Sequence, residues 1–216
     1  MPIKAIVFDL DGTLINSTRL HARSWIKSFE HHGFRDVDEG YVEMLVGLPG
    51  VEIVRLVLGE AGLRIYGSIR KLKNEIYLNY IDELNVYPGV YEVLNTLIDM
   101  GLKLGIASST PSQVLDRVLD FLNLKAFFNV VVPGDAVLKG KPNPEIYLKA
   151  FSSLGVDPKS GVVVGDTVYD IIPAKIINAY SILVTHGRDV SIDVEPDFKV
   201  AEIPEILDIV RRELMV

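Results

Sequence analysis

Cysteine is absent from this chain of 216 residues, and histidine is scarce, with 4 residues in all. Without cysteine the chain forms no disulfide, offers no thiolate nucleophile and builds no thiolate zinc site. The histidines form no HExxH-type pair; they are His21, His31, His32 and His186. Any metal ion must therefore be held mainly by oxygen atoms, which favours a hard ion such as Mg²⁺.

The chain also lacks an excess of positive charge and any long apolar run. Its 22 lysines and arginines stand against 29 aspartates and glutamates, for a net charge of −7. An acidic chain of this kind repels nucleic acids and anionic lipids, so neither is expected as a partner. The first apolar run is too short for a signal peptide, and no run of about 18 apolar residues follows it. We expect a cytoplasmic protein without a membrane-spanning segment.

What the sequence does contain is an alternation of apolar runs and amphipathic helical patterns. Five short apolar runs are continuous rather than alternating, as expected for parallel strands covered on both faces. They lie at residues 3–8, 104–107, 128–132, 161–164 and 182–184. Helical patterns occupy residues 88–100, 112–123 and 144–154 between the later runs. This order predicts the α/β class, with a doubly wound parallel sheet and right-handed crossovers.

Residues 16–85 interrupt this alternation, because they contain no convincing strand. Two apolar stripes at helical spacing run through them: Ala22, Trp25, Ile26 and Phe29, then Ile65, Ile69, Leu72, Ile76 and Tyr80. The sequence therefore predicts an all-helical cap domain over 16–85. It is inserted after the first strand of a core domain formed by 1–15 and 86–216.

Polar residues follow four of the five predicted strands, where open α/β sheets bind their ligands. They are Asp9, Asp11, Gly12 and Thr13, then Ser108, Ser109 and Thr110, then Lys139 and Lys141, then Asp166 and Asp170. Parallel strands end at one edge of the sheet, so we expect these side chains to meet. Other interpretations stay open: Asp-Gly is typical of tight turns, Ser108 and Asp170 are suited to capping the helices that follow, and Lys139 is expected to be a solvated lysine.

Together these segments resemble the four motifs of the haloacid dehalogenase-like superfamily, in its branch of phosphatases with a helical cap. The matching segments are DxDGT at 9–13, the serine at 108, KPxPE at 141–145 and GDTxxD at 165–170. The first and last motifs in this order are a specific signal, whereas the serine alone is weak. The resemblance extends from Ile3 to about Gly187 and includes the position of the insertion.

The resemblance implies a phosphatase that acts on small phosphorylated metabolites through an aspartyl-phosphate intermediate. It makes Asp9 the nucleophile and Asp11 the general acid and base. The residues that it places on the phosphoryl oxygens are Ser108, Ser109 through its amide, and Lys141. The residues that it places around Mg²⁺ are Asp9, Asp11 through its backbone carbonyl, and Asp166, with Asp170 in support.

The charges of these residues agree with that implication. Four carboxylates against one lysine leave the site at −3, which repels a phosphomonoester that carries nearly −2. At close range each pair of unit charges is worth about 4 kcal/mol. A divalent cation changes −3 to −1, and a proton on Asp11 changes that to 0. The site therefore makes sense only with a metal ion and one neutral acid, which we expect to be Asp11.

The cap is expected to set specificity, because the four motifs contact only the phosphoryl group. His21 and Lys73 resemble cap residues of the sugar-phosphate mutase branch, although a surface or partly packed role is the alternative for both. The Gly-Leu-Pro loop that starts at Gly47 resembles a cap loop of phosphoglycolate phosphatase-like members. The mutase branch has an arginine about three residues after that glycine. This chain has Gly50 there, and its nearest arginine is Arg55.

Three alternative functions are weighed against a phosphatase. The missing arginine disfavours a β-phosphoglucomutase-like mutase, and the presence of Asp11 disfavours a dehalogenase. A catalytically idle binding or regulatory protein has no reason to retain four charged site residues. We expect a monomer or homodimer that binds a small phosphorylated metabolite and neither nucleic acid nor membrane.

Overall fold

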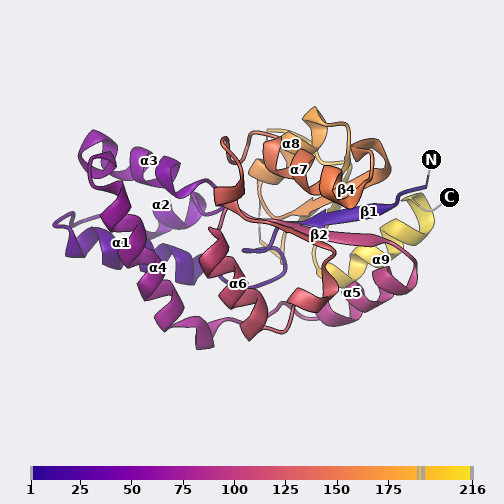
Figure 1. Cartoon of the computed structure of the whole chain (residues 1–216), viewed down its shortest axis with the longest axis horizontal. Helices are drawn as coiled ribbons and strands as arrows, with labels where there is room; N and C mark the ends of the chain where they lie inside the picture. The colour runs from indigo at the N-terminus through magenta and orange to yellow at the C-terminus, as the bar shows by residue number, and fades with distance from the viewer. Residues whose placement is uncertain (1, 189, 191–192, 215–216) are drawn as a thin grey trace.

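The computed structural model describes residues 2–188, 190 and 193–214 (Figure 1). The strands are β1 (Ala5–Phe8), β2 (Lys103–Ala107), β3 (Val130–Val132), β4 (Gly161–Gly165), β5 (Tyr180–Val184) and β6 (Phe198–Val200). The helices are α1 (Thr18–His31), α2 (Glu39–Met44), α3 (Gly50–Leu63), α4 (Tyr66–Asn79), α5 (Val90–Asp99), α6 (Ser112–Phe121), α7 (Glu145–Leu154), α8 (Val168–Ile176) and α9 (Ile206–Ile209).

Six strands of the described chain form one parallel sheet in the order β3-β2-β1-β4-β5-β6. β1 pairs with β2 on one side and with β4 on the other, and later strands are added outward in both directions. The strand order therefore reverses between β1 and β4, and such sheets bind ligands outside the carboxyl ends of those strands. The predicted doubly wound α/β fold is confirmed.

Helices cover both faces of the sheet, because alternate residues of each strand point to opposite sides. In β1, Ile6 and Phe8 join an apolar cluster with residues of α5, α6 and α9, whereas Ala5 and Val7 join a second cluster with residues of α7 and α8. Figure 1 shows α7 and α8 on one side of the sheet and α5 and α9 on the other. Burial on both faces explains why the strands are continuous apolar runs in the sequence.

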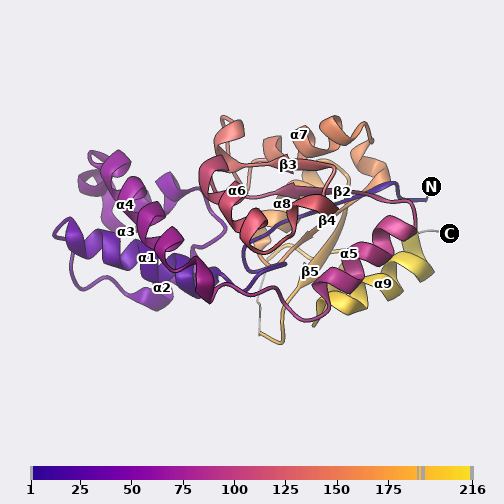
Figure 2. The same cartoon turned by 60° about the horizontal axis from the view of Figure 1, so that its bottom comes forward.

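Helices α1 to α4 form a separate body at the end of the sheet opposite the two chain termini (Figures 1 and 2). They enclose an apolar cluster of their own, in which Trp25, Phe29 and Ile69 are buried. Between residues 16 and 85, all of which are described, the structure has helices and turns and no strand beyond isolated bridges. The predicted helical insertion is therefore confirmed, while the limits of the two domains stay a prediction.

The chain enters and leaves this body through two neighbouring crossings. The Asn16 amide donates to the Asn85 carbonyl at 2.9 Å, and the Tyr87 amide donates to the Leu14 carbonyl at 3.0 Å. The two crossings are antiparallel neighbours and share these hydrogen bonds. They are the only covalent connections between the sheet and the helical insertion, which makes them the places where rotation would occur.

Two details of the sequence-based element boundaries are wrong. The sheet has a sixth strand, β6, at one edge. It is only three residues long and does not form an apolar run in the sequence, so it was not predicted. Proline is tolerated in the first turn of a helix, so Pro173 predicts a helix start near Asp170. Helix α8 instead begins at Val168, and Pro173 lies inside it. Pro173 has no amide hydrogen to donate to the Tyr169 carbonyl, so α8 contains the proline without one of its usual hydrogen bonds.

The buried face of α4 also differs from the predicted stripe. Its buried residues are Ile69, Lys73 and Tyr77, and only Ile69 belongs to that stripe. Ile65 and Tyr80, which the stripe includes, are exposed. Apolar periodicity fails here because the inward face carries a lysine and a tyrosine, which points to a polar function for that face rather than to packing alone.

No helix in the described residues combines the length and the apolar character that a bilayer crossing requires. The expected cytoplasmic location and the expected monomer or homodimer stay predictions.

Candidate active site

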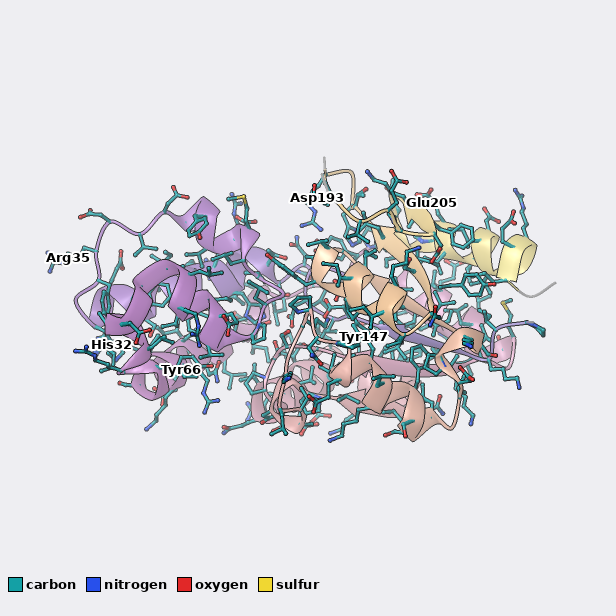
Figure 3. The ribbon with its side chains drawn as sticks, turned by 90° about the horizontal axis from the view of Figure 1, so that it is seen from above. His32, Arg35, Tyr66, Tyr147, Asp193 and Glu205 are labelled. Atoms are coloured by element: carbon teal, nitrogen blue, oxygen red, sulfur yellow. The ribbon has the colours of Figure 1, made fainter. Side chains whose placement is uncertain are left out.

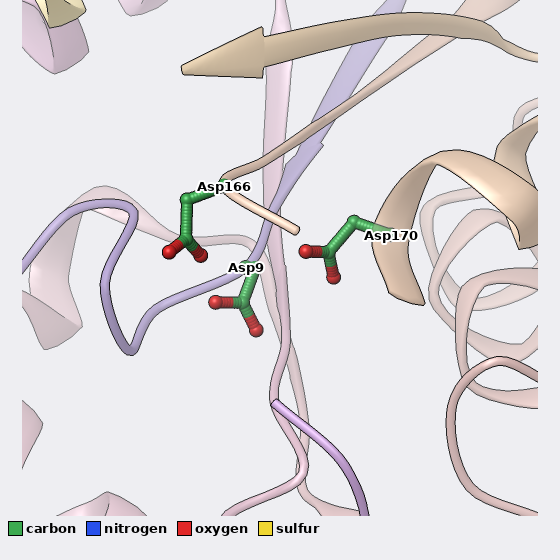
Figure 4. A group of neighbouring side chains, drawn as sticks. All are labelled: Asp9, Asp166 and Asp170. Atoms are coloured by element: carbon green, nitrogen blue, oxygen red, sulfur yellow. The ribbon is translucent and has the colours of Figure 1, made fainter. Parts of the chain in front are cut away.

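Three buried carboxylates gather where β1 and β4 end. Asp9 follows β1, Asp166 follows β4, and Asp170 lies in the first turn of α8. Each offers an oxygen atom within 4.8 Å of the other two, and Figure 4 shows the three side chains directed into one gap. The carboxyl ends of the two central strands thus bring together residues that are far apart in the sequence.

One lysine and one threonine bind this acidic cluster of Asp9, Asp166 and Asp170. The ammonium of Lys141 donates to Asp9 and, at 2.7 Å, to Asp170. The Thr13 hydroxyl lies 3.0 Å from Asp166 Oδ1 and 3.3 Å from Asp9 Oδ2. Lys141 is 1% exposed, so its charge is compensated by these carboxylates rather than by water. Removal of Lys141 would leave Asp9 and Asp170 buried without the ammonium that they share.

Asp170 both caps α8 and belongs to the acidic cluster. Its Oδ2 accepts hydrogen bonds from the Thr167 amide at 3.2 Å and the Thr167 hydroxyl at 2.9 Å. Its Oδ1 accepts from Lys141 and, at 2.8 Å, from the Tyr147 hydroxyl. The sequence indicates helix capping and site contact as alternative roles for Asp170, and in the structure Asp170 has both. Tyr147 is a contact of the site that no sequence motif indicated.

The carboxylate of Asp11 turns away from the acidic cluster. It accepts hydrogen bonds from the hydroxyls of Ser17 at 2.7 Å, Thr110 at 2.8 Å and Ser108 at 3.2 Å. These hydroxyls come from the start of α1 and from the loop after β2. The two aspartates of the first motif therefore have different surroundings, and only the backbone carbonyl of Asp11 stays a candidate metal ligand.

A chain of hydrogen bonds connects Asp11 with the helical insertion. His21 Nε2 lies 2.9 Å from Asp11 Oδ1, and His21 Nδ1 lies 2.8 Å from the Lys73 ammonium. The Tyr77 ring stacks on the imidazole with centroids 4.1 Å apart. His21 and Lys73 are both buried, so the surface position that the sequence left open for them is wrong. Their contact with substrate stays a prediction.

The surroundings of Asp11 favour its ionised form in the free protein, and the neutral form expected with metal and substrate bound stays a prediction. Burial raises the pKa of Asp11, but His21 and the hydrogen-bonding hydroxyls outweigh burial and hold that pKa below its ordinary value. The raised values belong to the acidic cluster instead. Burial raises the pKa of Asp9 well above its ordinary value, against the effect of Lys141, and burial raises the pKa of Asp166 to about 6.

Arg188 is a site residue that the strand-end argument missed. Its Nη2 donates to Asp166 Oδ2 at 2.8 Å, and its Nε donates to the Thr185 carbonyl at 3.0 Å. It lies in the loop after β5, and the same reasoning applied to the fifth strand would have found it. The positive charge of Arg188 reduces the net charge of −3 that the sequence indicated.

The two serines after β2 make different contacts. The Ser108 hydroxyl accepts from the Thr110 amide at 3.0 Å, and the Ser109 hydroxyl donates to the Gly47 carbonyl at 2.7 Å. Neither caps α6, which begins after Pro111. The Ser109 contact joins the core to the Gly47 loop of the insertion. Binding of phosphoryl oxygens by either serine stays a prediction, and Lys139 is exposed, as expected for a solvated lysine.

A cavity of about 980 Å³ lies between the helical insertion and the sheet, a volume suited to a small molecule. Its core wall includes Asp9, Asp11, Ser109 and Lys141. Its cap wall includes His21, Trp25, Gly47, Gly50, Tyr66, Arg70 and Lys73. The cavity therefore exposes charged groups from both bodies to one ligand. Sequence reasoning missed Trp25, Tyr66 and Arg70 as cavity residues, because helical spacing assigned the first to the core and did not distinguish the others.

Comparison with known proteins gives three kinds of likeness. The family model of haloacid dehalogenase-like hydrolases matches residues 6–184. The pyrophosphatase PpaX of Halalkalibacterium halodurans is 31% identical, over 97% of this chain and 98% of that protein. The phosphoglycolate phosphatase of Aquifex aeolicus is 26% identical, over 99% of each chain.

A solved structure of similar fold is that of a predicted phosphoglycolate phosphatase from Haemophilus somnus. It has a TM-score of 0.82 and 24% identity, and the likeness covers 96% of this chain and 97% of that one. At this level of identity it shows a common fold, with a helical body placed beside the sheet as here.

Proposed function

The chain belongs to the haloacid dehalogenase-like hydrolase family, and from this membership we propose that it is a Mg²⁺-dependent phosphatase of small phosphorylated metabolites. The observation that supports the proposal most is the buried acidic cluster of Asp9, Asp166 and Asp170 with Lys141 at the switch point of the sheet. Asp9 and Lys141 also line the cavity between cap and core, so a ligand there has access to both. The named relatives act on pyrophosphate or phosphoglycolate, which are small phosphorylated compounds.

Asp9 is the proposed nucleophile. The pairing of β1 with β2 and β4 fixes the backbone that carries it, and Lys141 holds one of its oxygens. Attack of an Asp9 oxygen on phosphorus forms a bond to phosphorus while the bond to the leaving alkoxide breaks. Water then attacks phosphorus, releases phosphate and restores the carboxylate, which divides one difficult displacement into two steps.

Asp11 is the proposed general acid and base. It would donate a proton to the leaving alkoxide and afterwards accept one from the attacking water. Its pKa is low in the free protein, so it must gain that proton when substrate binds. A phosphoryl group with nearly two negative charges supplies the reason, because a like charge nearby raises the pKa of a carboxyl. His21, bonded to both Asp11 and Lys73, orients the carboxylate.

The residues present fit a hard divalent cation. The donor set consists of oxygen atoms. Burial first, and the neighbouring carboxylates after it, raise the pKa values of Asp9 and Asp166, and a bound cation would favour their ionised forms. Asp9, Asp166 and the Asp11 carbonyl would hold Mg²⁺. Asp170 would support it from outside, because each of its oxygens already accepts two hydrogen bonds, whereas each oxygen of Asp9 and Asp166 accepts one from the described residues. When bound, the ion supplies positive charge for the phosphoryl oxygens.

The remaining site residues receive roles consistent with their positions. Lys141, the Ser108 hydroxyl and the Ser109 amide would bind phosphoryl oxygens. Lys141 contacts the acidic cluster at Asp9, and the two serines directly follow β2, where the Ser108 hydroxyl contacts Asp11. Residues 16–85 would form the cap and residues 1–15 and 86–216 the core. Gly47 would close the cap loop against the core, where Ser109 already contacts it.

The mutase alternative is disfavoured by the space around Gly50 as well as by the sequence. A Cβ atom at that position would lie 2.9 Å from Trp25 Cζ2 and 3.1 Å from the Tyr66 hydroxyl. Both the arginine of the mutase branch and the room for it are therefore missing. A second phosphate held in the mutase manner would need Trp25 or Tyr66 to move.

A panel of phosphorylated metabolites, with p-nitrophenyl phosphate as a generic ester, tests the proposed function. We expect release of inorganic phosphate from the generic ester and from a subset of metabolites in the presence of Mg²⁺. Absence of turnover across the whole panel, with the protein folded, would contradict the proposal and favour the idle binding protein instead.

A further inference from the structure

The cap wall of the cavity carries an arginine that the proposed chemistry does not use. Arg70 lines the same cavity as Asp9 and Lys141. Arg55 and Arg188 each pair with a carboxylate of this chain, whereas Arg70 pairs with none in the part of the chain that the structure describes. A cation that faces a ligand cavity without a carboxylate partner is suited to an anion from outside.

An aromatic ring holds this arginine in place. Tyr66 and Arg70 are four residues apart at the start of α4, so their side chains share one helix face. The Arg70 guanidinium carbon lies 5.5 Å from the Tyr66 ring centroid, which is within the range of a cation–π contact. Tyr66 belongs to the helical insertion, as Figure 3 shows. The contact limits the freedom of a long side chain that is otherwise exposed.

Gly50 allows the start of α3 to pack beside Tyr66 on the cap wall of the cavity. It is the first residue of α3, and a Cβ there would lie within 3.1 Å of both the Trp25 ring and the Tyr66 hydroxyl. Without a side chain, the start of α3 packs directly on both aromatic residues. The positive end of the α3 helix dipole therefore lies on the same wall of the cavity as Arg70. The wall combines a positioned guanidinium with a potential that favours anions.

We propose that Arg70 binds a second anionic group of the substrate, a carboxylate or a second phosphate, while the first phosphoryl group lies at Asp9. This inference rests on the proposed function and specifies its substrate class as phosphomonoesters with a further negative charge. A guanidinium presents a planar pair of donors that matches either anion. A neutral hydroxyl in the same place would leave the positive charge of Arg70 without an opposite charge.

Matched pairs of substrates test the proposal by kinetics. In one pair, 3-phosphoglycerate carries a carboxylate where glycerol 3-phosphate carries a hydroxymethyl group. In the other, fructose 1,6-bisphosphate carries a phosphate where fructose 6-phosphate carries a hydroxyl. We expect Arg70→Met to lower the ratio of kcat/KM between anionic and neutral member roughly tenfold or more in at least one pair. Loss in the first pair alone identifies a carboxylate, and loss in the second alone identifies a phosphate.

Lys71→Met is the matched control. Lys71 is the next residue of α4, carries the same charge, has a side chain 80% exposed and does not line the cavity. Its removal should leave both ratios at the wild-type value. Ratios that Arg70→Met changes by less than about twofold in both pairs would overturn the proposal. An equal loss in both variants would overturn it too, because the effect would then be long-range charge rather than contact.

A binding measurement separates failure of this inference from failure of the proposed function. Trp25 is the only tryptophan of the chain and lines the cavity, so its fluorescence reports ligand binding there. In the Asp9→Asn background, the Arg70→Met change should weaken binding of the anionic member of a pair roughly tenfold more than binding of the neutral member. If no ester is hydrolysed but this difference appears, the proposed function fails and the Arg70 site stands. If esters are hydrolysed and the difference is missing, only the Arg70 site fails.

Discussion

Asp9 and Asp11 are two residues apart, yet their carboxylates occupy opposite electrostatic surroundings. Asp9 faces two further carboxylates and one lysine, whereas Asp11 accepts three hydroxyl hydrogen bonds beside His21. Burial dominates for the first and raises its pKa, while hydrogen bonds and the imidazole dominate for the second and lower its pKa. Two residues of the same type therefore have opposite pKa shifts because their neighbours differ, and the proposed acid role of Asp11 requires that it gain a proton when substrate binds.

Asp9→Asn should abolish phosphatase turnover and leave the fold intact. The amide has nearly the shape of the carboxylate but does not form an acyl phosphate. Far-UV circular dichroism and the melting temperature should match or exceed the wild-type values, because a buried negative charge is removed from an acidic cluster. Purified variant that retains more than a few per cent of wild-type turnover would contradict the assignment of the nucleophile.

Lys73→Met should change how stability depends on pH. Burial lowers the pKa of Lys73 from 10.5 to about 8. Between these two pH values Lys73 is therefore mostly deprotonated in the folded protein and mostly protonated in the unfolded chain. Wild-type stability therefore rises with pH across that window, by up to about 3 kcal/mol. Below the window the folded state bears the full penalty of a buried ammonium.

Methionine has no such titration, so its stability advantage over lysine should shrink as pH rises from about 7.5 to about 10.5. Urea unfolding of both proteins at several pH values measures the difference. A difference that stays constant through the window would contradict the lowered pKa of Lys73.

Sequence predicts residues of this site only where a strand end or a motif indicates them. Asp9, Asp166, Asp170 and Lys141 meet as expected, because each follows or approaches the end of a parallel strand. Tyr147 was missed because it reaches Asp170 from inside α7, at a position that ordinary helical spacing assigns to the core. A side chain that serves packing with its ring and the site with its hydroxyl leaves no separate signal in the sequence.

At the scale of elements, strand ends and one helix terminus position the charged groups. β1 and β4 are adjacent and parallel, which places the residues after them side by side. The first turn of α8 adds Asp170 as the capping partner of Thr167. The long apolar strands were predictable because burial on both faces leaves a continuous run. The short edge strand β6 was not, and neither was the inward face of α4, which carries Lys73 and Tyr77.

Mg²⁺ should be required for turnover and should stabilise the folded protein. Carboxylates from three elements converge on one gap, and an ion that binds them only when folded raises the free energy of unfolding by about 2.7 kcal/mol at a hundred times its Kd. Exhaustive EDTA treatment should remove activity, and Ca²⁺ should inhibit because its looser coordination does not suit in-line transfer.

The control for this prediction compares two acidic residues. Asp166→Asn should abolish the thermal shift produced by Mg²⁺, whereas Glu52→Gln, a cavity carboxylate outside the acidic cluster, should retain it. Full activity after EDTA treatment, or an unchanged thermal shift in Asp166→Asn, would contradict the metal site.

At the scale of the whole molecule, the cap and the core are each built around a cluster of buried apolar residues, and two chain crossings join them. They also touch across the cavity, where Ser109 contacts Gly47 and Gly140 packs against Pro49. Asp9 lies on the wall of the same cavity, so these contacts limit access to it while the cap is closed. We therefore expect the cap to open and close about residues 14–16 and 85–87 during each turnover.

A disulfide between cap and core tests this motion, and the absence of natural cysteines makes it clean. An ideal Cβ at Gly140 lies 3.4 Å from the Pro49 Cβ, close to the spacing of a disulfide. The oxidised Pro49→Cys/Gly140→Cys protein should lose roughly tenfold or more in kcat/KM, and reduction should restore it. The single variants serve as controls. Full activity of a protein whose cross-link is verified by mass spectrometry would contradict the opening of the cap.

Covalent phosphorylation of Asp9 during turnover is the step on which the proposed mechanism depends most. Sodium borohydride reduces an aspartyl phosphate to homoserine, so addition during steady-state hydrolysis followed by peptide mass spectrometry locates the intermediate. We expect homoserine at position 9 when substrate and Mg²⁺ are both present and none in Asp9→Asn or without substrate. Unmodified Asp9 in protein that is turning over, or homoserine at another aspartate, would contradict it.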